Sequence, residues 1–297
     1  MKKLQRQGIL LGLAAVLLLG CICPVFSWLP IKPKLTPTPT PAGGGPTGPM
    51  QTPDTPTGED TIAVLEQNMI DVWTYIGKYF PSEYMPGTDI PTGADAVDFA
   101  QVLGILDHLK VEDGYEILYY FRQDGFGAYP HIFAKRTIDP IYPTLEEYMR
   151  AVPGCISGLR QPGCDYLEHV IVDGTELGYL QKVLLEIIGD QFYLEWHANY
   201  NDTKPILTKE AREEVIEDLR TTDFGNPISL VDSLRAKLID VRPRVDIEED
   251  GARVTLVTFT KWGGFFRHTY FVHDGAGYGI INEATENLLR YESGVMF

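Results

Sequence analysis

An uncharged apolar stretch near the N-terminus constrains this chain more than any other feature. It covers residues 8–29, a run of 22 residues without Asp, Glu, Lys or Arg. As a helix the run would be about 33 Å long, enough to cross a hydrocarbon core of about 30 Å. Lys2, Lys3 and Arg6 precede it, and basic flanks of this kind stay cytoplasmic. We therefore expect a protein held at the cell membrane, with the bulk of its chain extracytoplasmic.

The apolar stretch has three interpretations. It is a single spanning anchor, a lipoprotein signal or a cleaved signal peptide. Residues 18–21, Leu-Leu-Gly-Cys, resemble the bacterial lipobox, and this resemblance implies cleavage before Cys21 followed by acylation of its thiol. A cleaved signal has an apolar core of roughly 7–15 residues, and this run is longer. Length therefore favours the anchor, and the other two interpretations stay open.

A stalk is expected between the apolar stretch and the folded part, over residues 30–60. Residues 36–41 read Thr-Pro-Thr-Pro-Thr-Pro, and three consecutive glycines follow at 43–45. Proline lacks a backbone donor and glycine loses much entropy on ordering, so no core can form here. The segment resembles the Thr/Pro stalks of bacterial cell-surface proteins, which implies that the folded part is displayed at a surface.

The charge of the remaining chain excludes one class of partner. The whole chain has a net charge of −16; residues 1–60 hold five basic and three acidic side chains, which leaves 20 basic and 38 acidic side chains for residues 61–297, a net of −18. So acidic a domain is repelled by nucleic acid and by anionic lipid headgroups. We therefore expect no nucleic-acid partner, and a protein or carbohydrate ligand that the charge does not identify.

Two cysteines flank a turn-rich loop in the exported part. Cys155 and Cys164 enclose the sequence Ile-Ser-Gly-Leu-Arg-Gln-Pro-Gly. In an oxidising exterior such a pair forms a disulfide, whereas a metal site would need further thiols or a close His pair. We predict a Cys155–Cys164 disulfide and a sub-boundary near residues 155–165 in an otherwise continuous extracytoplasmic domain, residues 61–297.

Hydrophobic periodicity predicts an α+β domain, with helices packed on an antiparallel sheet. Apolar residues recur at helical spacing over 61–80, 92–106, 144–152, 176–188, 208–220 and 229–236. Strands are expected at 115–122, 128–136, 168–173 and 192–200. The final segments 237–247, 252–262, 265–273 and 278–282 are joined by glycine-rich turns, and so predict a C-terminal four-strand meander.

A row of polar side chains is the first candidate ligand site. In the alternating segment 192–200, Tyr193, Glu195, His197 and Asn199 fall on one face of a strand. A Glu beside a His can support general-base chemistry. The alternative is a solvated face on which Glu195 and His197 satisfy each other.

The second candidate is the aromatic and cationic turn at residues 261–267. Trp262, Phe265 and Arg267 lie there, and exposed aromatic rings at such a tip can stack on a sugar or bind a partner. The alternative is that Trp262 and Phe266 point into the core and stabilise the hairpin.

Catalytic motifs are absent from the sequence. It contains no Gly-x-Ser-x-Gly elbow, no phosphate-binding loop and no His-x-x-x-His or His-Glu-x-x-His pair. We therefore predict no catalytic residue, metal or cofactor, and a non-enzymatic module that binds a ligand or partner. The alternative is an extracytoplasmic hydrolase, acting on a glycan, with Glu195 and His197 as acid and base.

Overall fold

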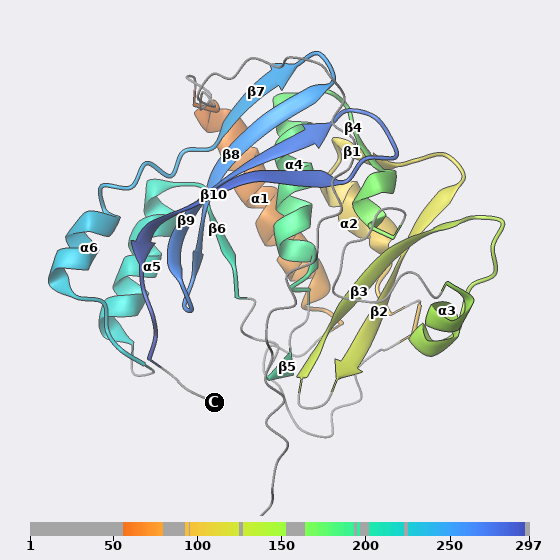
Figure 1. Cartoon of the computed structure of the whole chain (residues 1–297), viewed down its shortest axis with the longest axis horizontal. Helices are drawn as coiled ribbons and strands as arrows, with labels where there is room; N and C mark the ends of the chain where they lie inside the picture. The colour runs from red at the N-terminus through yellow and green to blue at the C-terminus, as the bar shows by residue number, and fades with distance from the viewer. Residues whose placement is uncertain are drawn as a thin grey trace, which may run out of the picture. The chain divides into compact units, whose positions relative to one another are not determined.

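A computed structural model describes residues 56–79, 93–94, 96–124, 127–152, 164–192, 195–196, 202–222 and 225–294, with only the backbone for 122–124, 127–129 and 195–196. The chain divides into Met1–Gly48 and Pro49–Phe297, and every described residue belongs to the second unit (Figure 1). The predicted anchor and most of the predicted stalk lie outside the described residues. Among the helices described, none is both long and apolar enough to cross a membrane.

The described part of the chain contains six α-helices and antiparallel sheets, so the predicted α+β class is confirmed. They are α1 (Glu59–Ile76), α2 (Phe99–Ile105), α3 (Leu145–Ala151), α4 (Glu176–Gly189), α5 (Lys209–Thr221) and α6 (Leu230–Ala236), with one 3₁₀ helix, η1 (Tyr166–His169). Five of them begin at a side-chain N-cap. The hydroxyl of Thr144, for example, accepts a hydrogen bond from the backbone N–H of Glu147 at 3.3 Å. α1 is an exception, because Gly58 precedes it and gives no side-chain cap.

The strands form antiparallel sheets. They are β1 (Leu109–Val111), β2 (Tyr115–Asp124), β3 (Gly127–Arg136), β4 (Val170–Val172), β5 (Glu195–Trp196), β6 (Lys204–Ile206), β7 (Arg244–Glu248), β8 (Gly251–Thr260), β9 (Gly264–His273) and β10 (Ile280–Arg290). β7, β8, β9 and β10 pair in succession, and β6 adds to the far end of β8. β2, β3 and β5 form a second sheet, and β1 pairs with β4.

The two faces of the β8–β9 hairpin are buried in two different cores. Its register pairs Thr258 with Phe266 and Phe259 with Phe265, so even-numbered residues share one face and odd-numbered residues share the other. The even-numbered Ala252, Val254, Leu256, Tyr270 and Val272 belong to the first core, with α1, α2 and α4. The odd-numbered Val257, Phe259 and Phe265 belong to the second core, with α5 and α6.

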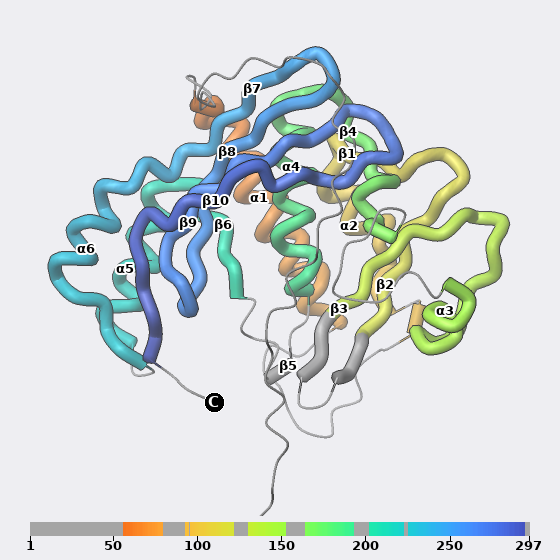
Figure 2. The backbone as a smooth tube through the Cα atoms, in the orientation of Figure 1, coloured from red at the N-terminus to blue at the C-terminus, as the bar shows by residue number. Residues whose placement is uncertain are grey.

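The helices of the first core and those of the second core pack on opposite faces of the sheet. α4 contacts β7, β8 and β9, whereas α5 contacts β6 and α6 contacts β10. In Figure 1, α1 and α4 lie behind the blue strands, and α5 and α6 lie beside their other end. The tube in Figure 2 shows the same separation along the backbone of β8, β9 and β10. One strand pair therefore joins the two cores.

A third cluster lies on the β2–β3 hairpin. β2 buries its odd-numbered Ile117, Tyr119 and Phe121 in the first core. Its even-numbered side chains Leu118 and Tyr120 pack with Phe133 of β3 and Tyr148 of α3. The Phe133 and Tyr148 rings stack with centroids 3.7 Å apart. β2 is thus another strand with both faces buried, and its free edge borders α2.

Several element boundaries differ from the predictions. The helix expected from residue 92 begins at Phe99, capped by Asp98, and the strand expected at 168–173 is a 3₁₀ turn followed by three residues of β4. β7 is shorter and β10 longer than expected, and β1 and β6 were not predicted. Short strands such as β6 form because a neighbouring strand supplies their hydrogen bonds, and local sequence does not record the neighbour.

Lys182 of α4 is a charged group inside the first core. Its side chain has 0 % exposure, and its ammonium donates a 3.4 Å hydrogen bond to the carbonyl of Tyr278. Burial lowers the pKa of Lys182 to about 8, and the carboxylate of Asp165 offsets only part of this effect. The charged ammonium therefore opposes folding at neutral pH.

We predict a pH-dependent effect of Lys182→Met. The pKa of Lys182 is lower in the folded than in the unfolded chain, so its stability penalty is complete below about pH 8 and disappears as the pH rises towards the ordinary value of 10.5. The variant's gain in free energy of unfolding over the wild type should be largest at pH 7 and should shrink across that window. Urea unfolding at several pH values measures it.

Lys237→Met is the matched control, because Lys237 is exposed at the end of α6. Its difference from the wild type should stay constant over the same pH range. A constant difference for Lys182→Met as well would contradict the account of the buried ammonium.

Candidate functional site

The structure describes only part of the predicted polar row. Glu195 lies in β5, where it pairs with Ala128 of β3. Tyr193, His197 and Asn199 lie outside the described residues, and the side chain of Glu195 is not described. An acid–base role for Glu195 and His197 thus stays a prediction. β5 belongs to the β2–β3–β5 sheet, so Glu195 and the strands that flank the 261–267 turn are on different sheets.

Phe265 corrects the prediction for the aromatic turn. Its ring is 0 % exposed and packs in the second core, with its centroid 4.9 Å from that of Phe259. A ligand at the surface cannot reach this ring. Phe266 lies on the opposite face of β9 and is half-buried, which is the outcome that strand alternation dictates for the next residue.

The other two predicted residues of the turn stay accessible. Trp262 is half-buried in the turn, and its backbone N–H donates to the hydroxyl of Thr260 at 3.3 Å. Arg267 is half-buried and forms a 3.0 Å ion pair with Glu286 of β10. Because Arg267 is odd-numbered, it lies on the face opposite to Phe266. The turn therefore does not present its aromatic and cationic groups as one surface.

Cys164 forms a disulfide, which agrees with an oxidising environment. Cys155 lies outside the described residues, as do Cys21 and Cys23, so the pairing of Cys155 with Cys164 stays a prediction. Cys164 also packs against the third cluster, beside Tyr148.

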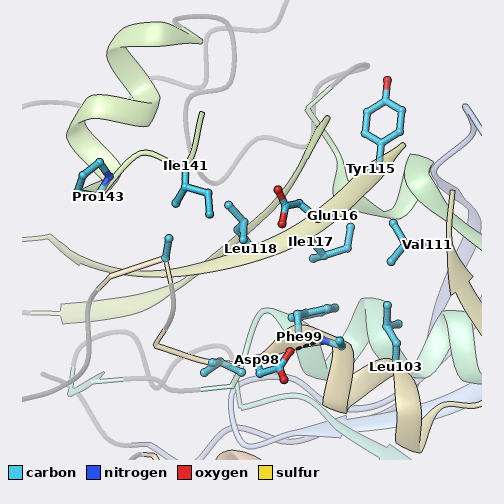
Figure 3. Close-up of a pocket in the computed structure, with 13 residues that line it drawn as sticks. Asp98, Phe99, Leu103, Val111, Tyr115, Glu116, Ile117, Leu118, Ile141 and Pro143 are labelled. Carbon is cyan, nitrogen blue, oxygen red and sulfur yellow. Dashed lines mark hydrogen bonds between the residues drawn. The ribbon is translucent and has the colours of Figure 1, made fainter. Parts of the chain in front are cut away.

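A large apolar cleft lies between α2 and β2. Its volume is about 800 Å³, within the range of about 300–1,000 Å³ typical of small-molecule sites. Figure 3 shows Phe99 and Leu103 of α2 facing Ile117 and Leu118 of β2 across the space. Ile141 closes the side next to α3 (Figure 3). We call this space the α2–β2 cleft.

The cleft exists because β2 is an edge strand with an apolar side chain on each face. Ile117 points into the first core, and Leu118 points into the third cluster. A groove along the edge therefore meets both side chains. α2 is only seven residues long and its other face is packed on α1. Its first turn, with Phe99, forms the opposite wall.

Two carboxylates border the α2–β2 cleft, and the described residues that line it include no basic side chain. Glu116 forms an ion pair with Lys135, its partner across the hairpin. The side chain of Lys135 is only 4 % exposed, and its ammonium also donates to the carbonyls of Arg136 and Asp139 at 2.9 and 2.8 Å. The ion pair with the buried Lys135 thus positions the Glu116 carboxylate at the rim of the cleft.

Asp98, the N-cap residue of α2, is the other carboxylate that borders the cleft. Its Oδ1 accepts a 3.0 Å hydrogen bond from the backbone N–H of Ala100, and its carbonyl accepts one from the Tyr75 hydroxyl at 3.0 Å. Burial raises the pKa of Tyr75, helped by the neighbouring Tyr79 hydroxyl, so this phenol remains a donor at neutral pH. The cap and the phenol together set the position of the Asp98 side chain.

Two histidine pairs lie elsewhere on the described surface. His108 Nδ1 is 2.6 Å from Asp173 Oδ2 and 3.1 Å from the Thr175 hydroxyl. A nucleophile relay needs the hydroxyl and the carboxylate on different ring nitrogens, and here both meet Nδ1. Thr175 also caps α4. The second pair joins His169 Nδ1 to Glu112 at 2.7 Å, with the His169 ring stacked on Tyr115. Both pairs therefore stabilise loop structure.

The described residues contain no group of three or more His, Cys, Asp or Glu side chains that could hold a metal ion. No protein-family model, curated protein or solved structure matches the chain.

Sequence reasoning missed the α2–β2 cleft, although a signal for it was present. The predicted strands 115–122 and 128–136 form the observed hairpin, although their spacing would place Glu116 opposite Ala134, and the observed register places it opposite Lys135. The predicted apolar face of the second helix already contained Phe99 and Leu103. What the sequence lacked was the packing of that helix beside β2.

We predict that Phe265 and Phe266 differ strongly in their effect on stability. Phe265→Ala should lower the free energy of unfolding by about 3–5 kcal/mol, because it leaves a cavity in the second core. Phe266→Ala, the matched control one residue away, should cost clearly less. Urea unfolding measures both. Equal costs for the two variants would mean that the assignment of faces in β9 is wrong.

Proposed function

We propose that this chain is a membrane-tethered, extracytoplasmic binding protein, and that its folded domain holds a small apolar molecule in the α2–β2 cleft without transforming it. The observation that carries the proposal is the cleft itself, about 800 Å³ of space between apolar side chains. Phe99 and Ile117 there are 2 % and 7 % exposed, so a ligand would extend an existing core. Burying apolar surface contributes about 25 cal/mol per Å².

The charged groups at the rim of the cleft indicate which polar group the ligand carries at its end. Asp98 and Glu116 are the ionisable groups among its described lining residues other than the Tyr115 phenol. Carboxylates accept hydrogen bonds and attract positive charge, and they repel an anionic headgroup. The proposed ligand is therefore an apolar chain with an ammonium or other hydrogen-bond-donating end. The net charge of −16 also opposes binding of nucleic acid.

The predicted anchor and stalk complete the proposal. Residues 8–29 would fix the chain in the bilayer, and residues 30–55 would let the folded domain move at the surface. The disulfide at Cys164 supports an oxidising exterior. A tethered domain with an apolar cleft suits the capture of amphiphiles that leave or approach the membrane.

The ligand class is tested by thermal unfolding of the full chain in lipid nanodiscs. Hexylamine should raise the melting temperature more than hexanoate at equal concentration, since a ligand that binds only the folded state stabilises it. Ala100→Trp fills the cleft from α2 and should abolish the hexylamine effect. Ala100 is exposed and lines the cleft, so the substitution leaves the core intact.

Gln101→Trp is the control for this experiment. Gln101 is the next residue of α2, is exposed and does not line the cleft. This variant should respond to hexylamine like the wild type. Equal stabilisation by hexanoate, or a full hexylamine effect in Ala100→Trp, would contradict the proposed ligand site.

Membrane attachment has a separate test. The full chain should remain in the membrane fraction after alkaline carbonate extraction, and deletion of residues 8–29 should release it. Cys21→Ser distinguishes the interpretations of this stretch: a spanning anchor predicts no change, and a lipoprotein signal predicts loss of acylation and of maturation. Recovery of the intact wild-type chain from the soluble cytoplasmic fraction would refute the tether.

A further inference from the structure

A second cleft lies where the sheet continues past the end of α4. Its volume is about 410 Å³, and α4, β8, β9 and β10 line it together with Thr203. α4 ends at Gly189, whereas β8 continues to Thr260. The face of the sheet that carries the first core therefore extends beyond the helix that covers it. We call this space the α4–β9 cleft.

The side chains of that face change from apolar to polar at the helix end. Leu256 and Tyr270 are the last apolar residues of the first core on β8 and β9. The next positions on the same face are Thr258 and His268, followed by Thr260 and Phe266. Polar groups in a dry core would carry a desolvation cost. Here they are hydrogen-bonded within the protein, and they line the α4–β9 cleft.

His268 organises the hydroxyl groups of the α4–β9 cleft. Its Nε2 lies 3.0 Å from the Thr258 hydroxyl and its Nδ1 lies 3.1 Å from the Thr285 hydroxyl. Burial lowers the pKa of His268, so the ring is neutral at pH 7. A neutral imidazole donates through one nitrogen and accepts through the other. It therefore orients the two hydroxyls in opposite senses, one as donor and one as acceptor.

The opposite wall supplies acceptors from α4. Glu186 and Asp190 are four residues apart, so both side chains lie on the helix face that borders the cleft. Gln191 is held next to them, since its amide nitrogen donates to the carbonyls of Ile187 and Thr203 at 2.8 and 2.7 Å. The described residues that line the cleft include no Lys or Arg. An anionic ligand would meet two carboxylates at this wall.

Phe266 gives the cleft an apolar, flat surface. It lies on the face of β9 that lines the space, and its ring packs over the turn at Gly263. A Cβ at Gly263 would lie 2.7 Å from two ring carbons of Phe266, so glycine is needed for this ring position. The ring therefore lines the same cleft as the hydroxyls and carboxylates.

We infer that the α4–β9 cleft binds one neutral sugar ring. The hydroxyls of a sugar donate to the carboxylates of Glu186 and Asp190 and bond with the exposed Thr285, which lies beside His268. The apolar C–H face of the sugar lies against Phe266. Carboxylates on one wall, with a hydroxyl and an aromatic ring on the other, match a ligand that is polar at its edge and apolar on its face. This site is independent of the α2–β2 cleft and of its proposed ligand.

The test is saturation-transfer NMR on the full chain in nanodiscs, with glucose, galactose and N-acetylglucosamine as probes and empty nanodiscs subtracted. At least one of these neutral sugars should give a signal, and glucuronate, which adds a carboxylate to the same ring, should give none. Glu186→Gln should raise the dissociation constant of the binding sugar by about tenfold, because the substitution removes a charged acceptor without changing the shape of the side chain. Phe266→Leu should weaken it as well.

Two controls keep the result interpretable. Glu176→Gln removes a carboxylate from the first turn of the same helix, outside the cleft, and should bind like the wild type. Ala100→Trp blocks the α2–β2 cleft and should also bind the sugar normally. The inference is overturned if no neutral sugar gives a signal, if glucuronate binds as tightly, or if both Glu186→Gln and Phe266→Leu bind at the wild-type level.

Discussion

The structure depends on the β8–β9 hairpin being buried on both faces. Leu256 and Val257 are neighbours in the chain and are 1 % and 2 % exposed, yet they belong to different cores. An ordinary amphipathic strand has one buried face, and its other face meets water. Here α4 covers one face of the hairpin near the β7 end, and α5 and α6 cover the opposite face near the 261–267 turn. A single strand pair thus connects both halves of the domain.

This arrangement explains where the clefts form. The helices that pack on a two-sided sheet cannot cover all of each face, so uncovered strips remain at the ends of the covering elements. The α4–β9 cleft is the strip beyond Gly189 of α4, and the α2–β2 cleft is the strip along the edge of β2. The same geometry explains the different fates of Phe265 and Phe266, which one residue of strand alternation places in a core and in a cleft.

Local chemistry made much of the fold predictable. The helices at 144–152, 176–188, 208–220 and 229–236 and the two strands of the β2–β3 hairpin were predictable, because their patterns involve residues close in sequence. The change of buried face within β8 was not readable, since residues 254–259 are all buried and their pattern carries no period. This missing information affected the prediction of the candidate site residues most. Phe265 was wrongly assigned to a ligand surface, because placing it in a core required knowing that α5 and α6 cover its side of the sheet.

Native-state hydrogen exchange tests the joining of the two cores most directly. If the β8–β9 hairpin couples them, the slowest amides of α4 in the first core and of α5 in the second core should exchange with the same free energy. That value should equal the global free energy of unfolding. If the amides of α5 and α6 exchange at a clearly lower free energy while α4 stays protected, the cores open separately, and the account of a shared hairpin is wrong.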